Sequence, residues 1–568
     1  MASNFFNKAS LVMVPDAPID GKLPSVKPED RSGDFTFSRG SNLAATRVNK
    51  GGLIEKGREN LLLQSNQFDT TWALGGASVT SGQAGYDGSN DAWLLEKSAT
   101  NGRVFQNISQ SGVQTFSVYA KSGTNNWAFL LVNGGGNPNQ WYDLENGVLG
   151  NSSSTPVDSS ITSVGNGWYK ISITFNETIS RVRIYVADSN NSNIGTSGSI
   201  YIQDAQLEQG LVATGYIETT TATVQKGILE NLPRIDYSGG ASCPSLLLEP
   251  QRTNLFTQSE YFSGSYWGKT GTGGANAPVV TQNYAVSPEG LQNASRVQFD
   301  TNGSTSSHRS GLVRDFAFTT GDKYAISCWV KATSGNSEIF TFRIAGQQVG
   351  GEKTATNEWQ LFTETYIATA TTTDNFGMQI RGNYSSQTSD ILIYGMQLES
   401  AVSYPTSYIP AYGSSVTRSL DDAQTTPADT IDTQSFTLFF EHKALGSSGT
   451  DWIYRLDING TSDNISFYVN SSVSLNVYLG NANGGYIFGS SLNDGFTIGS
   501  NSKVALSYDG NRLAYFINGG LYDSATGVSF NDANNKLIIR GVKNIINKQT
   551  IAFPKALTDD ECIALTTI

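Results

Sequence analysis

Residues 60–72 read NLLLQSNQFDTTW, and residues 254–267 repeat this stretch as NLFTQSEYFSGSYW. Five residues of the first copy recur unchanged 194 positions later, and the closing tryptophan follows with a slip of one residue. The tripeptide QLE at residues 206–208 returns at residues 397–399, so the far ends of the two copies also correspond. Ends that match about 150 residues apart are typical of a duplicated domain, whereas solenoid repeats are much shorter.

The composition around these repeats indicates an all-β protein. Hydrophobic residues make up 38% and charged residues 15% of the 568-residue chain, and 59 glycines favour turns between short strands. The 9 Trp, 25 Tyr and 27 Phe are enough to fill several cores, which disordered chains lack. Alternating runs at residues 116–121, 181–186 and 326–331 are typical of half-buried strands. We therefore predict tandem antiparallel β-sandwiches of the jelly-roll type.

The N-terminal residues differ from the repeats in character. Pro15, Pro18, Pro24 and Pro28 interrupt regular structure, so we expect an extended arm that docks onto another protein, although a plain linker fits the same pattern. The sequence predicts five parts: an extended N-terminal arm at 1–59, a first jelly roll at 60–222, a linker at 223–244, a second jelly roll at 245–422 and a third sandwich at 425–568.

The third sandwich carries clear local signals. The sequences DGN at residues 509–511 and NGG at residues 518–520 lie between apolar runs and predict tight hairpins, because Gly and Asn accept a positive φ. Thr558 and Glu561 form a capping-box pattern, in which each side chain can bond the other residue's amide. A short helix is therefore predicted near the C-terminal end.

Charge and cysteine usage limit the partners and the compartment. The net charge of −12 makes nucleic acid an unexpected partner. No apolar run approaches the roughly 18 residues of a membrane span, and residues 1–18 do not resemble a signal peptide, so no membrane insertion is expected. Cys243, Cys328 and Cys562 are odd in number and far apart, which indicates assembly in a reducing cytoplasm without a disulfide framework.

Catalytic groups are sparse in this sequence. There are two histidines, His308 and His442, and the chain lacks the HExxH, GxSxG and Walker patterns. A glycosidase needs only two carboxylates, and 49 acidic residues leave that alternative open, although no pair stands out. We therefore expect a protein without enzymatic activity.

The repeated motifs resemble a known group of proteins. The opening pattern NLxxQSxxFxxxW, the closing QLE, and the sequences SYIP at 407–410 and GSSVTR at 413–418 resemble repeated modules in tail and fibre proteins of tailed bacteriophages. These modules are in turn similar to carbohydrate-binding jelly rolls. Residues 508–510 and 553–558 resemble parts of concanavalin-like or laminin-G-like sandwiches. The resemblance covers about residues 45–568.

This resemblance implies a structural protein of a virion: a head fibre, tail fibre or decoration protein on the particle surface, assembled in the cytoplasm of the host bacterium. The arm would bind other virion proteins, the protein would be a homo-oligomer (a trimer by analogy with fibres), and the sandwiches would attach to host-surface glycans, with the third sandwich at the distal tip. A purely structural decoration role remains open. A secreted bacterial polysaccharide-binding adhesin and a polysaccharide depolymerase spike are the alternatives.

Two sets of residues are candidates for ligand contacts. Trp127, Trp141 and Tyr142 lie near loop-like sequence in the first repeat and could stack on a sugar, although core packing is the alternative for each. Carbohydrate-binding modules of this kind often hold a structural Ca²⁺ between an acidic residue after the first Phe and an Asp of the last strand. Asp69 and Asp204 match those positions, and ordinary surface aspartates are the alternative.

Overall fold

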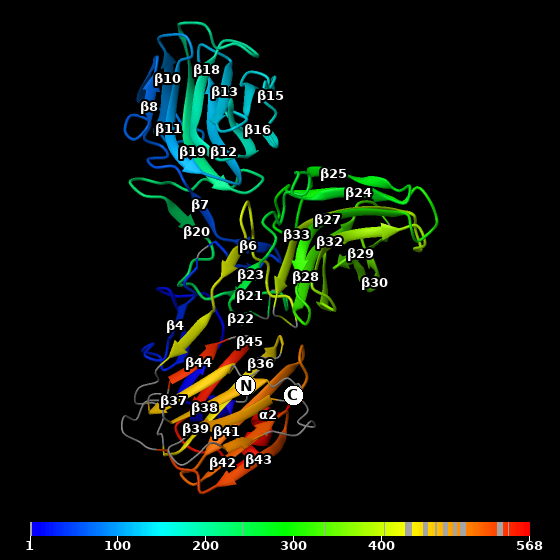
Figure 1. Cartoon of the computed structure of the whole chain (residues 1–568). Helices are drawn as coiled ribbons and strands as arrows, with labels where there is room; N and C mark the ends of the chain where they lie inside the picture. Colours follow the sequence, from blue (N-terminus) through cyan, green and yellow to red (C-terminus); the bar gives the residue numbers. More distant parts are fainter. Residues whose placement is uncertain are drawn as a thin grey trace.

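The computed structural model of the chain consists of three β-rich units (Figure 1). It describes residues 3–41, 43–240, 242, 244–335, 337–400, 402, 404–425, 434–446, 452–459, 463–469, 475–480, 486–488, 496–530, 538–542 and 545–568. Both chain ends lie in the same unit, at the bottom of Figure 1. The all-β prediction is confirmed, because antiparallel sheets dominate each unit.

Repeat one is a sandwich of two antiparallel sheets, here called sheet 1A and sheet 1B. In spatial order, sheet 1A contains β16 (Asp158–Gly165), β17 (Trp168–Asn176), β12 (Val113–Ser122), β19 (Gly198–Gln209), β10 (Ala92–Lys97) and β9 (Ala77–Gln83). Sheet 1B contains β15 (Val148–Leu149), β14 (Asn139–Asp143), β13 (Trp127–Asn133), β18 (Ile179–Ala187), β11 (Arg103–Gln110) and β8 (Ala73–Gly75). The inward residues of both sheets form one core.

Repeat two has the same plan in sheets 2A and 2B. Sheet 2A contains β25 (Asn276–Ala285), β26 (Ala294–Asp300), β33 (Thr388–Ser400), β28 (Lys323–Ala332) and β31 (Gln360–Ile367). Sheet 2B contains β24 (Gly268–Thr272), β27 (Arg309–Phe318), β32 (Thr372–Arg381), β29 (Glu338–Ile344) and β30 (Gln347–Ala355). Five strands in each sheet follow the order of their counterparts in repeat one, so the duplication seen in sequence is also a duplication of topology.

A buried asparagine of the repeated motif joins the first and last segments of each sandwich. The Asn60 side-chain amide donates to the carbonyl of Ile217 at 2.8 Å, and Asn254 does the same to Ile409 at 2.9 Å. All four residues are at most 3% exposed. A buried amide that bonds the backbone of the far end ties the first and last segments together. The residues that both repeats share therefore account for the fold of each repeat. Ligand contacts are expected from other residues.

The terminal unit is assembled from three separate stretches of the chain. Its first sheet contains β21 (Ile235–Asp236), β22 (Ser245–Leu248), β45 (Ile545–Phe553), β36 (Phe436–Ala444), β41 (Asn501–Tyr508), β42 (Arg512–Ile517) and β43 (Gly520–Thr526), with β1 (Leu11–Met13) and β3 (Ser25–Lys27) attached. Its second sheet contains β2 (Lys22–Leu23), β4 (Phe35–Ser38), β35 (Asp422–Thr425), β44 (Ile538–Val542), β37 (Tyr454–Asn459), β38 (Asp463–Val469), β39 (Leu475–Gly480) and β40 (Tyr486–Phe488).

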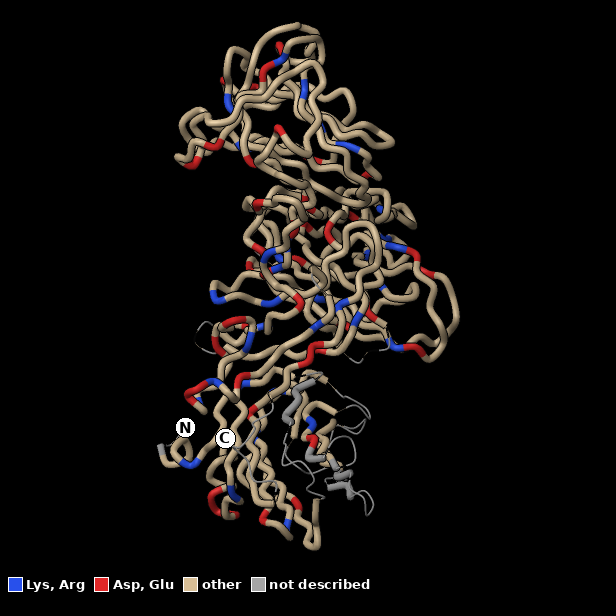
Figure 2. The backbone as a smooth tube through the Cα atoms, turned by 90° about the vertical axis from the view of Figure 1, so that its left-hand side faces the viewer, with Lys and Arg blue, Asp and Glu red and all other residues tan. Residues whose placement is uncertain are grey.

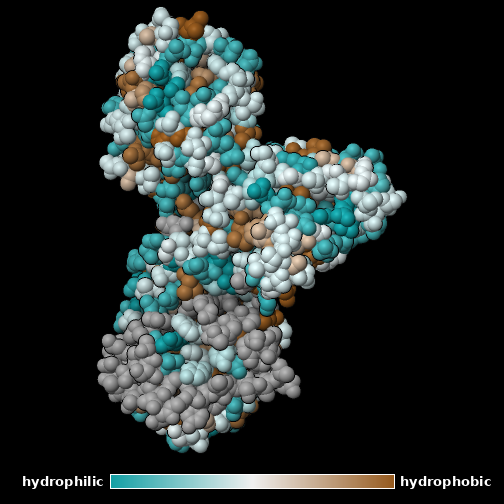
Figure 3. All heavy atoms as spheres, in the orientation of Figure 1, coloured by the Kyte–Doolittle hydropathy of each residue, from teal (hydrophilic) through white to brown (hydrophobic). Residues whose placement is uncertain are grey.

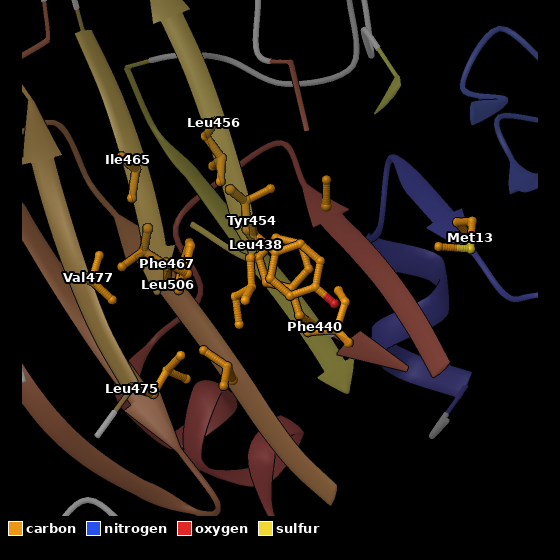
Figure 4. Close-up of a cluster of buried hydrophobic side chains, with 14 of the residues drawn as sticks. Met13, Leu438, Phe440, Tyr454, Leu456, Ile465, Phe467, Leu475, Val477 and Leu506 are labelled. Atoms are coloured by element: carbon orange, nitrogen blue, oxygen red, sulfur yellow. The ribbon is translucent and has the colours of Figure 1, made fainter. Parts of the chain in front are cut away.

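The N-terminal segment is not the free arm that the prolines suggested. Leu11 pairs with Ala552 of β45, and Phe37 pairs with Ala423 of β35. Leu11 is fully buried, and Met13 belongs to the same core cluster, which Figure 4 shows. The short apolar strands extend both sheets, and pairing across 541 residues for Leu11 and 386 residues for Phe37 is not visible in the local sequence pattern. The expectation of an extended N-terminal arm is therefore wrong.

The local predictions for the terminal unit are confirmed. Residues 509–511 and 518–519 form the turns of the β41–β42 and β42–β43 hairpins, with Asn518 at a φ of 48°. Helix α2 (Asp559–Thr566) begins at Thr558, whose hydroxyl accepts the amide of Glu561 while the Glu561 carboxylate accepts the amide of Thr558. A second short helix, α1 (Ser3–Lys8), was not foreseen. Neither of these two described helices could cross a bilayer.

Short linking strands and a buried ion network join the three units. The linking strands are β5 (Thr46–Val48), β6 (Ile54–Lys56), β7 (Arg58–Asn60), β20 (Val224–Lys226), β23 (Arg252–Asn254) and β34 (Val416–Arg418). Arg234 and Arg418 lie 2.8 and 3.0 Å from the Glu249 carboxylate, and Arg39 lies 3.3 Å from Asp421, which also pairs with Arg234. Burial would raise the pKa of Glu249, but Arg418 and Arg234 lower it to about 2. The Glu249 carboxylate therefore stays charged and pairs with buried arginines.

Candidate functional site

Aromatic side chains form one row on the outer face of sheet 1B. Alternate residues of a strand point to opposite faces, so every second residue of β13, β14 and β18 faces away from the core. Phe129 lies directly opposite Trp141 on β14 and Tyr185 on β18. Arg103 on β11 lies opposite Tyr185. The row therefore crosses four neighbouring strands and ends in a guanidinium group.

The rings of this row support one another. The ring centroids of Phe129 and Trp141 are 3.7 Å apart in a stacked arrangement, and those of Phe129 and Tyr185 are 5.2 Å apart. These three residues are 4 to 6% exposed. Trp127 and Leu131, which pack against them from β13, are only half-buried. The buried rings of Phe129, Trp141 and Tyr185 form a packed aromatic surface, and the indole of Trp127 at its edge is accessible.

Three arginines border this aromatic surface. The Arg181 guanidinium lies 4.5 Å from the ring centroid of Phe105, and the Arg103 guanidinium lies 5.6 Å from Phe105 and from Tyr185. Arg183 Nη1 donates a hydrogen bond to the Tyr185 hydroxyl at 3.0 Å. None of the three arginines forms an ion pair within the part of the chain that the structure describes. Ring contacts thus hold Arg103 and Arg181, a hydrogen bond holds Arg183, and the guanidinium groups keep further donors for a ligand.

These groups together suit a ligand that has both apolar and oxygen-rich sides. An accessible indole stacks on an apolar ring face, and fixed guanidinium donors bond hydroxyl or carboxylate oxygens. Figure 2 shows basic and acidic residues interspersed along the chain, and Figure 3 shows hydrophobic residues in small separate patches on the face in view.

The structure separates the three aromatic residues that the sequence suggested. Trp127 and Trp141 share the outer face, and Trp141 is mostly covered. Tyr142 follows Trp141 on the same strand and therefore points inward, where it is fully buried and its hydroxyl donates to the carbonyl of Ser172 at 2.7 Å. Tyr142 is a core residue, so the suggestion that it contacts a sugar is wrong.

The sequence contained a signal for the residues that were missed. Residues 181–186 read RVRIYV, and strand alternation places Arg181, Arg183 and Tyr185 on one face with the apolar residues on the other. A strand whose outward positions hold two arginines and a tyrosine indicates a binding face as well as a core. Phe129 and Arg103 join this face through strand pairing, which local sequence does not show.

The two aspartates proposed for calcium differ in their surroundings. Asp69 is exposed, whereas Asp204 is 6% exposed and accepts a hydrogen bond from the Tyr86 hydroxyl at 2.9 Å. Burial raises the pKa of Asp204 to about 7, and the nearby charges of Asp91 and Asp87 act in the same direction. Among the described residues, no group of three or more His, Cys, Asp or Glu side chains could hold a metal ion. Two carboxylates alone do not supply the six to eight oxygens that Ca²⁺ takes.

The two described cysteines play no part in this face. Cys328 and Cys562 are buried and free, and burial raises the pKa of the Cys562 thiol to about 12. Cys243 lies outside the described residues. Neither of the described thiols has the accessible, low-pKa character of a reactive cysteine.

Comparison with known proteins gives structural similarities alone. No protein-family model and no curated protein matches the sequence. Domain 4 of AbnA, a GH43 extracellular arabinanase from Geobacillus stearothermophilus in complex with arabinotriose, is similar with a TM-score of 0.22 and 14% identity over 26% of this chain and 73% of that chain. The CBM40 domain of the Ruminococcus gnavus IT-sialidase bound to α2,3 sialyllactose gives a TM-score of 0.21 and 15% identity over 24% and 84%.

The binding domain of botulinum neurotoxin DC, in complex with rat synaptotagmin II, is also similar, with a TM-score of 0.22 and 15% identity. The match covers 26% of this chain and 39% of that chain. TM-scores of this size over a quarter of the chain assign neither a ligand nor an activity to this protein.

Proposed function

We propose that the chain is a glycan-binding protein without enzymatic activity, and that the outer face of sheet 1B holds the glycan. The row Trp141, Phe129, Tyr185 and Arg103 carries this proposal, because it places an indole-bearing aromatic surface beside fixed donors. Trp127 supplies the accessible ring, and the arginines supply hydrogen bonds to oxygens of the sugar. A single site of this size binds weakly, so several copies would act together.

We further propose that the protein is displayed on a bacteriophage particle as a fibre, decoration or tail component. The motifs NLxxQSxxFxxxW, QLE and SYIP support this proposal through their resemblance to phage modules. The N-terminal segment and the third sandwich form one unit, so the third sandwich cannot be the distal tip while that segment binds the particle. We therefore propose that the terminal unit contacts other virion proteins and that the two repeats extend toward the host (Figure 1). A homotrimer is proposed by analogy with fibres.

The glycan site is tested with Trp127→Ala in the full chain. Affinity electrophoresis through gels that contain bacterial surface polysaccharides measures the dissociation constant for each polymer. Loss of the indole is expected to weaken binding about five- to tenfold, which corresponds to about 1–1.4 kcal/mol. Tyr284→Ala is the control, because Tyr284 is 44% exposed on β25 of repeat two and lies outside the face.

Three outcomes would change this proposal. Equal retardation of Trp127→Ala and the wild type would remove the site from sheet 1B. Release of reducing sugar during incubation would assign a depolymerase activity instead. Absence of the protein from purified particles, measured with an antibody against the chain, would contradict the virion role and favour a secreted adhesin.

A further inference from the structure

The outer face of sheet 2B gathers three arginines from three neighbouring strands. Arg309 on β27 lies directly opposite Arg381 on β32. Arg343 on β29 donates from Nη1 to the side-chain oxygen of Gln379 at 3.1 Å, and Gln379 lies two residues from Arg381 on β32. The segment with β5 and β6 packs on the outer face of sheet 2A through Ile54. Sheet 2B forms the other side of repeat two, and Figure 1 draws β29 and β30 away from the rest of the chain.

The positive charge on this face is nearly unpaired. Among the described residues, Arg309 and Arg381 form no ion pair and donate no side-chain hydrogen bond, and Arg343 reaches Asp374 at a distance of 3.8 Å. The Asp374 side chain is 38% exposed, so water screens that contact. Burial lowers the pKa of Arg343 and of Arg381, and the charge of Arg309 lowers both further. Like charges held this close favour the binding of an anion.

Buried donors on this face also lack acceptors. The Nε atoms of Arg309, Arg343 and Arg381 have no hydrogen-bond partner. Gln379 is 1% exposed, interacts with the Tyr384 side chain and accepts the hydrogen bond from Arg343, so it positions that arginine from below the surface. Buried donors without acceptors cost free energy in the folded state, and an oxyanion that approaches the face can take hydrogen bonds from this group.

The buried arginines at the junction of the units, by contrast, have carboxylate partners. Arg39, Arg234 and Arg418 at the junction of the units are each paired with Asp421 or Glu249. The face of sheet 2B departs from that pattern, although the chain carries 49 acidic residues against 37 basic ones. Three arginines that an acidic protein supplies with a single, exposed carboxylate partner indicate a ligand that brings its own negative charge.

We propose that Arg309, Arg343 and Arg381 bind the carboxylate or sulfate groups of an acidic polysaccharide, with Gln379 holding Arg343 in place. The anion site consists of these three arginines, while the polymeric nature of the ligand rests on the proposed function of repeat one. Planar guanidinium groups from three strands match the planar or tetrahedral oxygens of such groups with paired hydrogen bonds. A polysaccharide with spaced charges also suits a protein whose net charge repels densely charged nucleic acids.

The experiment compares the double variant Arg343→Gln/Arg381→Gln with the wild-type full chain. The probes are polygalacturonate, which carries carboxylates, dextran sulfate, which carries sulfate esters, and neutral dextran. Arg314→Gln is the control, because Arg314 is an exposed arginine on β27 whose guanidinium stacks on Tyr266. The double variant is expected to lose about tenfold or more in affinity for at least one acidic polymer, while Arg314→Gln stays within about twofold. The preferred polymer identifies the anionic group.

Folding and specificity are controlled in the same series. Removal of like charges is expected to leave the melting temperature of repeat two unchanged or higher, and Arg309→Gln replaces the double variant if that protein does not fold. Equal losses in Arg314→Gln and the double variant would overturn the proposal in favour of diffuse charge attraction, as would equal binding of DNA. Unchanged binding of both acidic polymers in the arginine variants would also overturn it. Trp127→Ala distinguishes the two sites, because it tests repeat one and leaves the arginines of sheet 2B in place.

Discussion

The N-terminal strand β1 is predicted to stabilise the terminal unit, and Leu11→Ala measures this contribution. Leu11 is fully buried and pairs with Ala552. Truncation of a buried leucine to alanine costs about 2–5 kcal/mol, because the apolar contact is lost and a cavity remains. For a unit of about 150–250 residues, each kcal/mol lowers the melting temperature by about 2–4 °C. The transition of the terminal unit is therefore expected to fall by about 4–20 °C.

Calorimetry of the full chain measures this shift, and hydrogen exchange assigns it to a unit. Amides of β45 are expected to exchange faster in Leu11→Ala, while those of β19 in repeat one keep their wild-type rates. Val26→Ala is the control in the same segment, since Val26 is 49% exposed and its loss should cost no more than about 0.5 kcal/mol. Unchanged melting and unchanged β45 exchange in Leu11→Ala would refute the placement of this strand.

Two further predictions concern protons and calcium. Burial lowers the pKa of His442 from 6.5 to about 4. The terminal unit therefore keeps its full stability above pH 6.5, where the imidazole is neutral in the folded and the unfolded state. As the pH falls from 6.5 to 4, the free energy of unfolding should drop by about 3 kcal/mol, since one pKa unit corresponds to about 1.36 kcal/mol. His442→Phe is expected to flatten this part of the stability curve of the terminal unit in urea titrations, and an identical pH profile for both proteins would contradict the role of His442. If Asp69 and Asp204 share a Ca²⁺ ion, millimolar CaCl₂ added to EDTA-treated protein should raise the melting temperature of repeat one. At a hundredfold excess over the dissociation constant, the ion would add about 2.7 kcal/mol to the free energy of unfolding. Asp204→Asn should abolish that rise, and equal curves with and without Ca²⁺ would show that both residues are ordinary aspartates.

The features that sequence predicted correctly depend on neighbouring residues. The hairpin turns at 509–511 and 518–519 need a residue that tolerates positive φ, and the cap at Thr558 needs a Glu three positions later. The duplication was visible because each sandwich uses the same buried amides, Asn60 and Asn254, to fix its ends. Such requirements act over a few positions or recur in both copies, so the sequence displays them.

The features that sequence missed depend on pairing between distant strands. Leu11 contacts a strand more than 500 positions away, and nothing near Leu11 in sequence indicates that partner. The prolines of this region predict an arm, although short strands lie between them. Because these strands pair with β45 and β35, removal of residues 1–44 is expected to damage the terminal unit. The error about Tyr142 was avoidable, because consecutive residues of a strand point to opposite faces.

The two repeats share a fold and differ on their outer faces. Arg103 and Arg309 occupy the same position at the start of β11 and β27, but the residue opposite is Tyr185 in repeat one and Arg381 in repeat two. The first face thus combines rings with guanidinium groups, and the second concentrates charge. The two proposed sites can hold neighbouring parts of one polymer, because the first contact raises the effective concentration of the second. A long acidic glycan should therefore lose more affinity than a short oligosaccharide when either face is altered, since the short ligand reaches one face at a time.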